Sequence, residues 1–439
     1  MSSTPPQPQP PFLARLASRI GPGLITACVV IGPGSVFTSS KAGASLGYPA
    51  AIIVLCSALL MNVYMTLAAR LGVVTQRSTA SLVTEQFGRW LAVLIGVAVC
   101  VIATIFQTGN NLAVISAVEV IASQAAATEA ATPASPVSDA NGVTELASLI
   151  AIAALVLLNL LAVVFLFAFK NFYHALERLM MGFVAVMLLA FAANLAFAIW
   201  QGGSTDTQPA GNWLDISTIG LIGTTFISAA AYYQSYLVRF RGWRREQLDS
   251  GLFDARVGSA IMGLITLMVL ATAATSLRGK TLASPQDYAM QLRPLFGAAG
   301  VWVFFLGLLS AAYSSFLVNS MIGGFLLADG AGLGDRPTDR WPQRFTAGVL
   351  ITGAAAASVL AQQGISLNSA IIAAQALTVL FAPLMAGVIW WLTAREQVMG
   401  NDRNGPMLNL GAAIGFVVLL VLSGYLLLTR VWPALNAAP

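Results

Sequence analysis

The sequence predicts an all-α integral membrane protein with about eleven transmembrane helices. Three observations predict this class. Of the 439 residues, 57% are hydrophobic and only 9% are charged, whereas a soluble domain carries about 25% charged residues. Many segments approach the roughly 20 apolar residues that a helix needs to cross hydrocarbon. Lys and Arg also gather in alternate connections between these segments, which is typical of a chain that crosses the bilayer repeatedly.

The candidate spans follow one another with short connections, so we expect one membrane domain over about 21–430. The Pro/Gln-rich start, 1–20, predicts a disordered cytoplasmic tail. Because no small-residue cleavage site follows Arg15 and Arg19, we interpret the first apolar segment as a retained helix. The candidate spans are 21–45, 48–70, 91–122, 147–169, 179–200, 214–239, 255–277, 299–328, 345–361, which is the shortest, 369–393 and 408–429.

The distribution of basic residues sets the expected orientation. With a cytoplasmic N-terminus, 17 of the 22 Lys and Arg residues lie on the cytoplasmic side and 5 on the other. A missed or invented helix in the middle of the chain would scramble this asymmetry, so the asymmetry supports both the count and the orientation. The basic runs are therefore interpreted as topology signals, and no nucleic-acid partner is expected.

Two candidate spans contain residues that make poor helix. The first holds Gly32-Pro33-Gly34-Ser35, where proline removes a backbone donor and glycine permits non-helical angles. A plain proline kink is the alternative. The sixth span holds small and β-branched residues over 223–231, without proline. Because unpaired backbone is costly in hydrocarbon, such breaks need a polar cavity or neighbouring protein.

The matching positions of the two segments support the interpretation of each as a helix break. Spans one and six open two successive groups of five, and matching breaks in two halves indicate an inverted-repeat transporter with a central site. We therefore expect one repeat over about 21–200, a second over about 214–393, and an extra helix over about 408–429. Broken helices offer carbonyl oxygens to a cation and N–H groups to an anion.

Several short motifs, in order along the chain, resemble the Nramp (natural resistance-associated macrophage protein) family of proton-coupled divalent metal transporters. The likeness is densest in the first 75 residues. The motifs are Gly21-Pro22-Gly23-Leu24, Gly32-Pro33-Gly34, Lys41-Ala42-Gly43-Ala44, Gly47-Tyr48, the segment 67–75, Gly307-Leu308-Leu309-Ser310-Ala311 with Ser314-Ser315, and Met399-Gly400 followed by Asn404.

The resemblance implies a LeuT-type fold of two inverted five-helix repeats. We also expect the protein to lie in the bacterial inner (plasma) membrane. The resemblance further implies a metal site at the two breaks, but the family's ligands are missing. Its Asp-Pro-Gly-Asn becomes 32–35 here, and its Met-Pro-His becomes 227–229. We expect backbone carbonyls and neutral oxygens in their place. The candidate substrate or ion-binding residues are Gly32, Ser35, Thr224, Ile227 and Gln375.

Other intramembrane polar residues could line a transport path. The alternative for each is interhelical hydrogen bonding that only supports packing. Glu119 is a candidate proton relay, although an interfacial acid near a helix end explains it equally well. The lone His174 is interpreted as a solvated loop residue. The path-lining candidates are Gln107, Asn110, Asn111, Ser315 and Asn319.

Three functions remain open from the sequence. The first is a secondary active transporter that moves a divalent metal ion by alternating access, as a proton symporter. The second is a transporter of the same fold for a monovalent ion or a small organic solute. The third is a membrane receptor without transport. No nucleotide-binding loop, zinc motif or hydrolytic triad occurs, so an enzyme is not expected. The expected partners are the bilayer and a small solute, with no resident cofactor.

Overall fold

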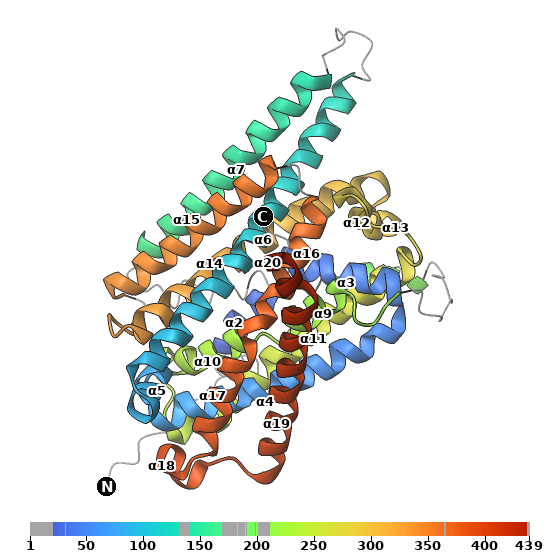
Figure 1. Cartoon of the computed structure of the whole chain (residues 1–439). Coiled ribbons are helices and arrows are strands. Elements are labelled where there is room, and N and C mark those ends of the chain that lie inside the picture. Colours follow the sequence, from blue (N-terminus) through green and yellow to red (C-terminus); the bar gives the residue numbers. More distant parts are fainter. Residues whose placement is uncertain are drawn as a thin grey trace, which may run out of the picture.

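The computed structural model describes residues 21–30, 32–130, 140–168, 182, 189, 191–197, 199–200, 211–336, 338–363 and 366–436. The predicted tail over 1–20, His174 and half of the predicted span 179–200 lie outside these residues. Within the described ranges, the regular elements are all helices (Figure 1). The prediction of an all-α membrane protein is confirmed.

The described residues contain nine helices long and apolar enough to cross a membrane, and a tenth span if one bent pair of helices is counted. The eleventh predicted span is 179–200. The main helices are α2 (Pro22–Val30), α3 (Pro33–Leu46), α4 (Ala51–Thr75), α6 (Arg89–Ala130), α7 (Ala140–Ala168), α9 (Ile216–Thr225), α10 (Ser228–Phe240), α11 (Leu248–Ser276), α14 (Gly300–Gly330), α15 (Arg340–Gln362), α16 (Leu367–Leu377), α17 (Ala382–Ala394) and α19 (Pro406–Leu426). The short ones are α5 (Thr79–Phe87), α12 (Pro285–Ala289), α13 (Arg293–Phe296), α18 (Glu396–Met399) and α20 (Trp432–Asn436).

Burial separates central helices from peripheral ones. In the most apolar window of α9 and α10, 89% of the residues are buried, compared with 28% in α7 and 22% in α19. Large apolar side chains such as Leu160 on α7 and Val421 on α19 are exposed. Because hydrocarbon can accept such side chains, the exposed faces of the peripheral helices α7 and α19 suit contact with lipid. The interrupted helix α9–α10 therefore runs through the middle of the bundle.

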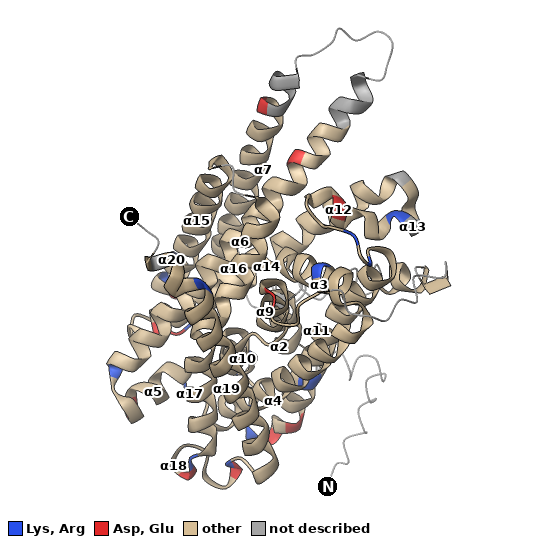
Figure 2. Ribbon diagram, turned by 45° about the vertical axis from the view of Figure 1, so that its right-hand side comes forward, with Lys and Arg blue, Asp and Glu red and all other residues tan. Residues whose placement is uncertain are grey.

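Charged residues lie mainly toward the ends of the helices (Figure 2). At one end, the Arg70 side chain donates to the Asp402 backbone oxygen over 2.6 Å. There Arg245 also pairs with the Asp402 carboxylate, and Arg239 pairs with Asp335. We call this the basic end; it carries α5 and α18. The opposite end carries α12 and α13 (Figure 1).

One predicted boundary needs correction. The segment predicted as the short span 345–361 belongs to α15, which has 23 residues. The predicted span 369–393 is present as Leu367–Ala394, in which the 3₁₀ segment Thr378–Phe381 joins α16 to α17. The division into repeats over 21–200 and 214–393 stays a prediction.

Candidate functional site

The first predicted break is present and sharp. Helix α2 ends at Val30, α3 begins at Pro33, and their axes differ by 62°. Gly32 is the extended N-cap of α3, with φ −97° and ψ 168°. Pro33 suits the first helical position because its missing N–H would have no partner there. A Cβ on Gly32 would lie 2.9 Å from Ser315 Oγ and 3.3 Å from Asn110 Oδ1, so a larger side chain at position 32 requires its neighbours to shift.

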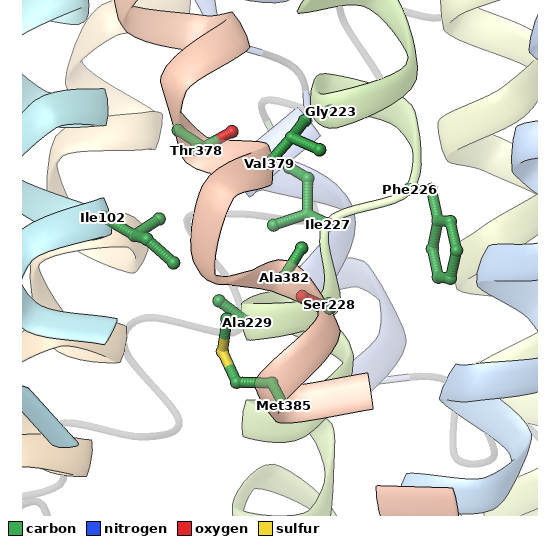
Figure 3. A pocket seen from close by; sticks show the side chains of 10 residues that line it. All are labelled: Ile102, Gly223, Phe226, Ile227, Ser228, Ala229, Thr378, Val379, Ala382 and Met385. Atoms are coloured by element: carbon green, nitrogen blue, oxygen red, sulfur yellow. The ribbon is translucent and has the colours of Figure 1, made fainter. Parts of the chain in front are cut away.

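The second predicted break is also present, and it forms without proline. Phe226 and Ile227 separate α9 from α10 and have ψ angles of 72° and 95°. Beside them lies a cavity of about 10 Å³, which is close to the smallest space that holds one water. In Figure 3, Ile227 points toward Val379, whereas the Phe226 ring lies on the other side of the chain.

A 3₁₀ segment, which the sequence analysis did not predict, lies beside the second break. It covers Thr378–Phe381 and joins α16 to α17, and Thr378 donates a hydrogen bond to the Gln375 backbone oxygen over 2.7 Å. Pro383 in the first turn of α17 was the available signal. Thr378 lines the same small cavity as Ile227 (Figure 3).

Gln375 lies at the centre, between α3 and α6. A Cβ on Gly34 would lie 2.5 Å from Gln375 Cγ and closer still to its amide group, and a Cβ on Gly109 would lie 2.8 Å from Gln375 Nε2. The side chain is fully buried, and neither amide atom has a hydrogen-bond partner within the described ranges. Leaving such a group unpaired costs about 1–3 kcal/mol, so this position is suited to a polar ligand or water.

The path-lining candidates divide into two groups. Asn110 Nδ2 donates to Ser315 Oγ over 2.8 Å, next to Gly32, and Asn110 Oδ1 has no partner among the described residues. By contrast, Asn319 donates to the Ala103 backbone oxygen, and Asn111 accepts from Asn159 on α7. These last two bonds join helices and support packing.

Gln107 is fully buried one turn before Asn111 on α6. A Cβ on Gly353 of α15 would lie 2.6 Å from Gln107 Cγ, so the glycine makes room for this side chain. Neither amide atom of Gln107 has a partner in the part of the chain that the structure describes. The Gln107 side chain therefore lies against α15, and no hydrogen bond of its amide joins it to the breaks among those residues.

The remaining candidate site residues occupy separate places. Thr224 Oγ1 lies 3.4 Å from Thr38 Oγ1, which connects α9 to α3. Ser35 Oγ donates to the Gly32 carbonyl over 3.4 Å. The Ser35 side chain also lines a second cavity of about 10 Å³ with Thr266 and Val269 of α11. The structure thus brings Gly32, Thr224 and Gln375 around α3, while Ser35 and Ile227 line two different small cavities.

Glu119 lies on α6, nine residues after Asn110, and it is partly buried. At about 1.5 Å per residue, this is roughly 13 Å along the helix axis. In the ranges that the structure describes, no three His, Cys, Asp or Glu side chains are grouped so that they could hold a metal ion. The polar atoms described above at the breaks belong to neutral amide, hydroxyl and carbonyl groups.

Sequence reasoning also missed Thr38 and Gly109. Thr38 donates to the Gly34 carbonyl over 2.9 Å, in the first turn of α3. Gly109 makes room for the Gln375 amide. A glycine next to an intramembrane amide, as at 109–110, could have indicated a close helix approach. The identity of the facing residue cannot be read from that pattern.

Two helices broken at their centres, inside a bundle with apolar outer helices, define the discontinuous-helix class of multi-pass membrane transporters. The sequence profile of the family described as "Natural resistance-associated macrophage protein-like" matches residues 23–429. The chain therefore belongs to the Nramp family.

Two relatives cover nearly the whole chain, and both bear the name "Divalent metal cation transporter MntH". The one from Verminephrobacter eiseniae is 24% identical over 93% of this chain and 88% of its own length. The one from Burkholderia ambifaria is 25% identical over 97% of this chain and 90% of its own length.

Solved structures show the fold. The manganese transporter of Eremococcus coleocola, in complex with an aromatic bis-isothiourea compound, matches with a TM-score of 0.71 and 17% identity, over 98% of this chain and 90% of that one. MhsT, solved with L-phenylalanine, matches with a TM-score of 0.55 and 15% identity, over 91% of this chain and 98% of that one. MhsT has the LeuT fold, so the predicted fold class is confirmed.

Proposed function

We propose that this chain moves a metal ion across the plasma membrane by alternating access around the two central helix breaks. The observation that carries the proposal is the pair of breaks, at Gly32 and at Phe226–Ile227, in a chain that matches the Nramp family over 23–429. The names of the MntH relatives and of the Eremococcus manganese transporter support a metal ion as cargo.

The donors near the breaks favour an ion that keeps part of its water. Gln375 and Asn110 offer amide oxygens without partners among the described residues, and the breaks offer backbone carbonyls. Hard divalent ions accept such oxygens, and Mg²⁺ in particular retains several waters. Thioether sulfur, which favours softer transition metals, is absent from the matching position, Ile227. We expect weaker discrimination between manganese and magnesium than a sulfur ligand would give.

Orientation and coupling form part of the same proposal. The basic end faces the cytoplasm, because 17 of the 22 Lys and Arg residues belong there under the predicted topology. A divalent cation that moves inward then gains about 4.6 kcal/mol from a 100 mV inside-negative potential. Glu119 remains the candidate proton acceptor for coupled transport.

The test is uptake into proteoliposomes of manganese and of magnesium, compared with sodium, L-phenylalanine and protein-free vesicles. We expect saturable uptake of at least one divalent ion, weakened about tenfold or more in Gln375→Ala, because a lost hydrogen bond to a charged ligand costs about 1.5–3 kcal/mol. Gln363→Ala is the matched control, since Gln363 is exposed at the end of α15. Sodium or phenylalanine uptake without metal uptake would refute the proposed cargo.

Ser35→Asp tests whether position 35 belongs to the site. The Ser35 side chain is 6% exposed and lines the cavity beside α11, so a carboxylate there would reach the cargo only if that cavity joins the transport path. Tighter divalent uptake in this variant places position 35 on the path. Unchanged metal uptake argues against Ser35 as a ligand.

A further inference from the structure

Helix α2 begins at the basic end without an N-terminal cap of its own. Gly21 occupies the N-cap position, because its carbonyl accepts from Leu24 and Ile25 N–H. Glycine has no side chain that could cap the helix, and Pro22 has no N–H. The N–H groups of Gly21 and Gly23 are therefore the donors in this turn that need an acceptor from elsewhere in the protein.

Asp254, in the second turn of α11, supplies that acceptor. Gly21 N–H donates to Asp254 Oδ1 over 2.7 Å, and Gly23 N–H donates to Asp254 Oδ2 over 2.6 Å. The carboxylate is fully buried, and the positive end of the helix dipole favours its negative charge. One side chain of α11 thus holds both donors of the first turn of α2.

The two helix backbones touch at the same place. A Cβ on Gly23 would overlap the backbone carbonyl oxygen of Asp254. A Cβ on Gly258, one turn further along α11, would lie 2.6 Å from the Gly23 carbonyl oxygen. The Asp254 carboxylate can reach the amides of Gly21 and Gly23 only because the two positions where the helix backbones touch, 23 and 258, are both glycine.

A third helix joins the contact through Gln234 of α10. Gln234 Nε2 donates to Asp254 Oδ2 over 3.1 Å, and Thr26 Oγ1 donates to Gln234 Oε1 over 2.6 Å. Helices α2 and α10 are the halves of the two broken helices that run toward the basic end. Asp254 therefore ties both halves to the continuous helix α11.

We propose that Asp254 is a positioning residue that latches α2 and α10 against α11 and so keeps the pathway closed at the basic end. The latch rests on the alternating access proposed above, because a path from the breaks to the basic end opens when α2 leaves α11. That movement breaks the two Gly–Asp254 bonds and the Thr26–Gln234 bond together. Removing them shifts the population toward the conformation that is open at this end.

Cys28 provides a reporter for this movement, since it lies on α2 and is only 1% exposed. The background is Cys56→Ser with Cys100→Ser, which leaves Cys28 as the sole thiol. The purified protein in detergent is treated with a polar maleimide, and the labelling rate is measured by mass spectrometry. Asp254→Asn places an amide NH₂ or a weaker neutral acceptor opposite the glycine donors, and we expect labelling at least tenfold faster than in the parent.

Two further variants isolate the cause. Gly23→Ala leaves the carboxylate intact but forces α2 away from Asp254, so it is expected to raise the labelling rate as well. Asp249→Asn is the matched control, because Asp249 is exposed in the first turn of α11 and lies outside the contact. This variant should label like the parent. Parent-like rates in both Asp254→Asn and Gly23→Ala would overturn the latch.

Two further outcomes also test the latch: variants that do not fold, and labelling that disagrees with metal uptake. If size-exclusion chromatography shows that Asp254→Asn and Gly23→Ala do not fold, Thr26→Val is the alternative. It removes the bond from the Thr26 hydroxyl to Gln234, along with that hydroxyl's bond to the Pro22 carbonyl within α2, and a parent-like rate in that variant overturns the proposal. Labelling needs no substrate, so the proposed function is tested separately. Faster labelling without any metal uptake would refute the cargo and retain the latch. Normal metal uptake together with parent-like labelling in the latch variants would retain the proposed cargo and refute the latch.

Discussion

Gly34→Ala tests whether the close approach of α3 to α16 positions the Gln375 amide. A Cβ at position 34 would lie 2.5 Å from Gln375 Cγ, and it would be nearer still to the amide group. Carbon atoms in contact are normally about 3.5–4.0 Å apart. The Gln375 side chain must therefore move by an ångström or more. It cannot do so toward α6, because it already packs against Gly109.

The expected size of the effect follows from this geometry. Adding a methyl group to a packed interior costs about 1–3 kcal/mol of folding stability. If the amide binds a charged substrate, its displacement costs a further 1.5–3 kcal/mol of binding free energy. At about 1.4 kcal/mol per factor of ten, affinity should fall roughly 10-fold to 100-fold. A lower melting temperature and a higher KM are both expected, because the two losses have one steric cause.

The assay is a double-mutant cycle of Gly34→Ala with Gln375→Ala, read by thermal unfolding and by the KM for divalent ion uptake. Gln375→Ala removes the overlapping atoms, so the double variant should be little worse than Gln375→Ala alone. Gly348→Ala on α15 is the control, since its Cβ meets nothing within 4 Å. Strictly additive losses would refute the reasoning, because Gly34 would then act independently of Gln375.

Two predictions concern packing away from the breaks. Tyr236→Phe should cost about 1–3 kcal/mol of stability in chemical denaturation, because it leaves the Asp329 carboxylate without the 2.7 Å bond that the Tyr236 hydroxyl donates; a change within error would mean that Asp329 finds another donor. Gly324→Ala should lower the melting temperature strongly, since its Cβ would lie 2.6 Å from Thr346 Cα. Gly307 lies on the same helix, and a Cβ there meets nothing within 4 Å, so Gly307→Ala should not lower the melting temperature strongly. Equal decreases in the two variants would contradict the packing argument.

The fold could be predicted because the bilayer imposes a simple rule on the chain. Apolar segments long enough to cross hydrocarbon are visible in a single sequence, and alternation of basic residues checks their number. The break at Gly32-Pro33 was predictable from local chemistry. The break at Phe226–Ile227 has no proline, and only its position relative to the first break indicated it. Pro383 marked the 3₁₀ segment Thr378–Phe381, but the apolar run around it hid the signal.

The contacts of the site could not be predicted in the same way. Gly34 and Gln375 are 341 positions apart, and their contact depends on how α3, α6 and α16 approach one another. The latch has a similar origin, since Asp254 is more than 230 positions away from the two glycines whose N–H groups it accepts. Polar residue types were visible, but the packing that leaves the Gln375 amide without a partner among the described residues and pairs Asn319 depends on tertiary structure.

Position 32, where the family motif has an aspartate and this chain has Gly32, is tightly packed against its neighbours. A Cβ on Gly32 already approaches Ser315 Oγ to 2.9 Å and Asn110 Oδ1 to 3.3 Å. An aspartate at this position would therefore displace the Asn110–Ser315 hydrogen bond as well as add a charge. Ser315→Gly combined with Gly32→Asp would remove the closer of these two contacts and leave the contact with Asn110 Oδ1. The neutral site is a packed arrangement of three helices, and a cation that binds there depends on amide oxygens and retained water to offset its desolvation.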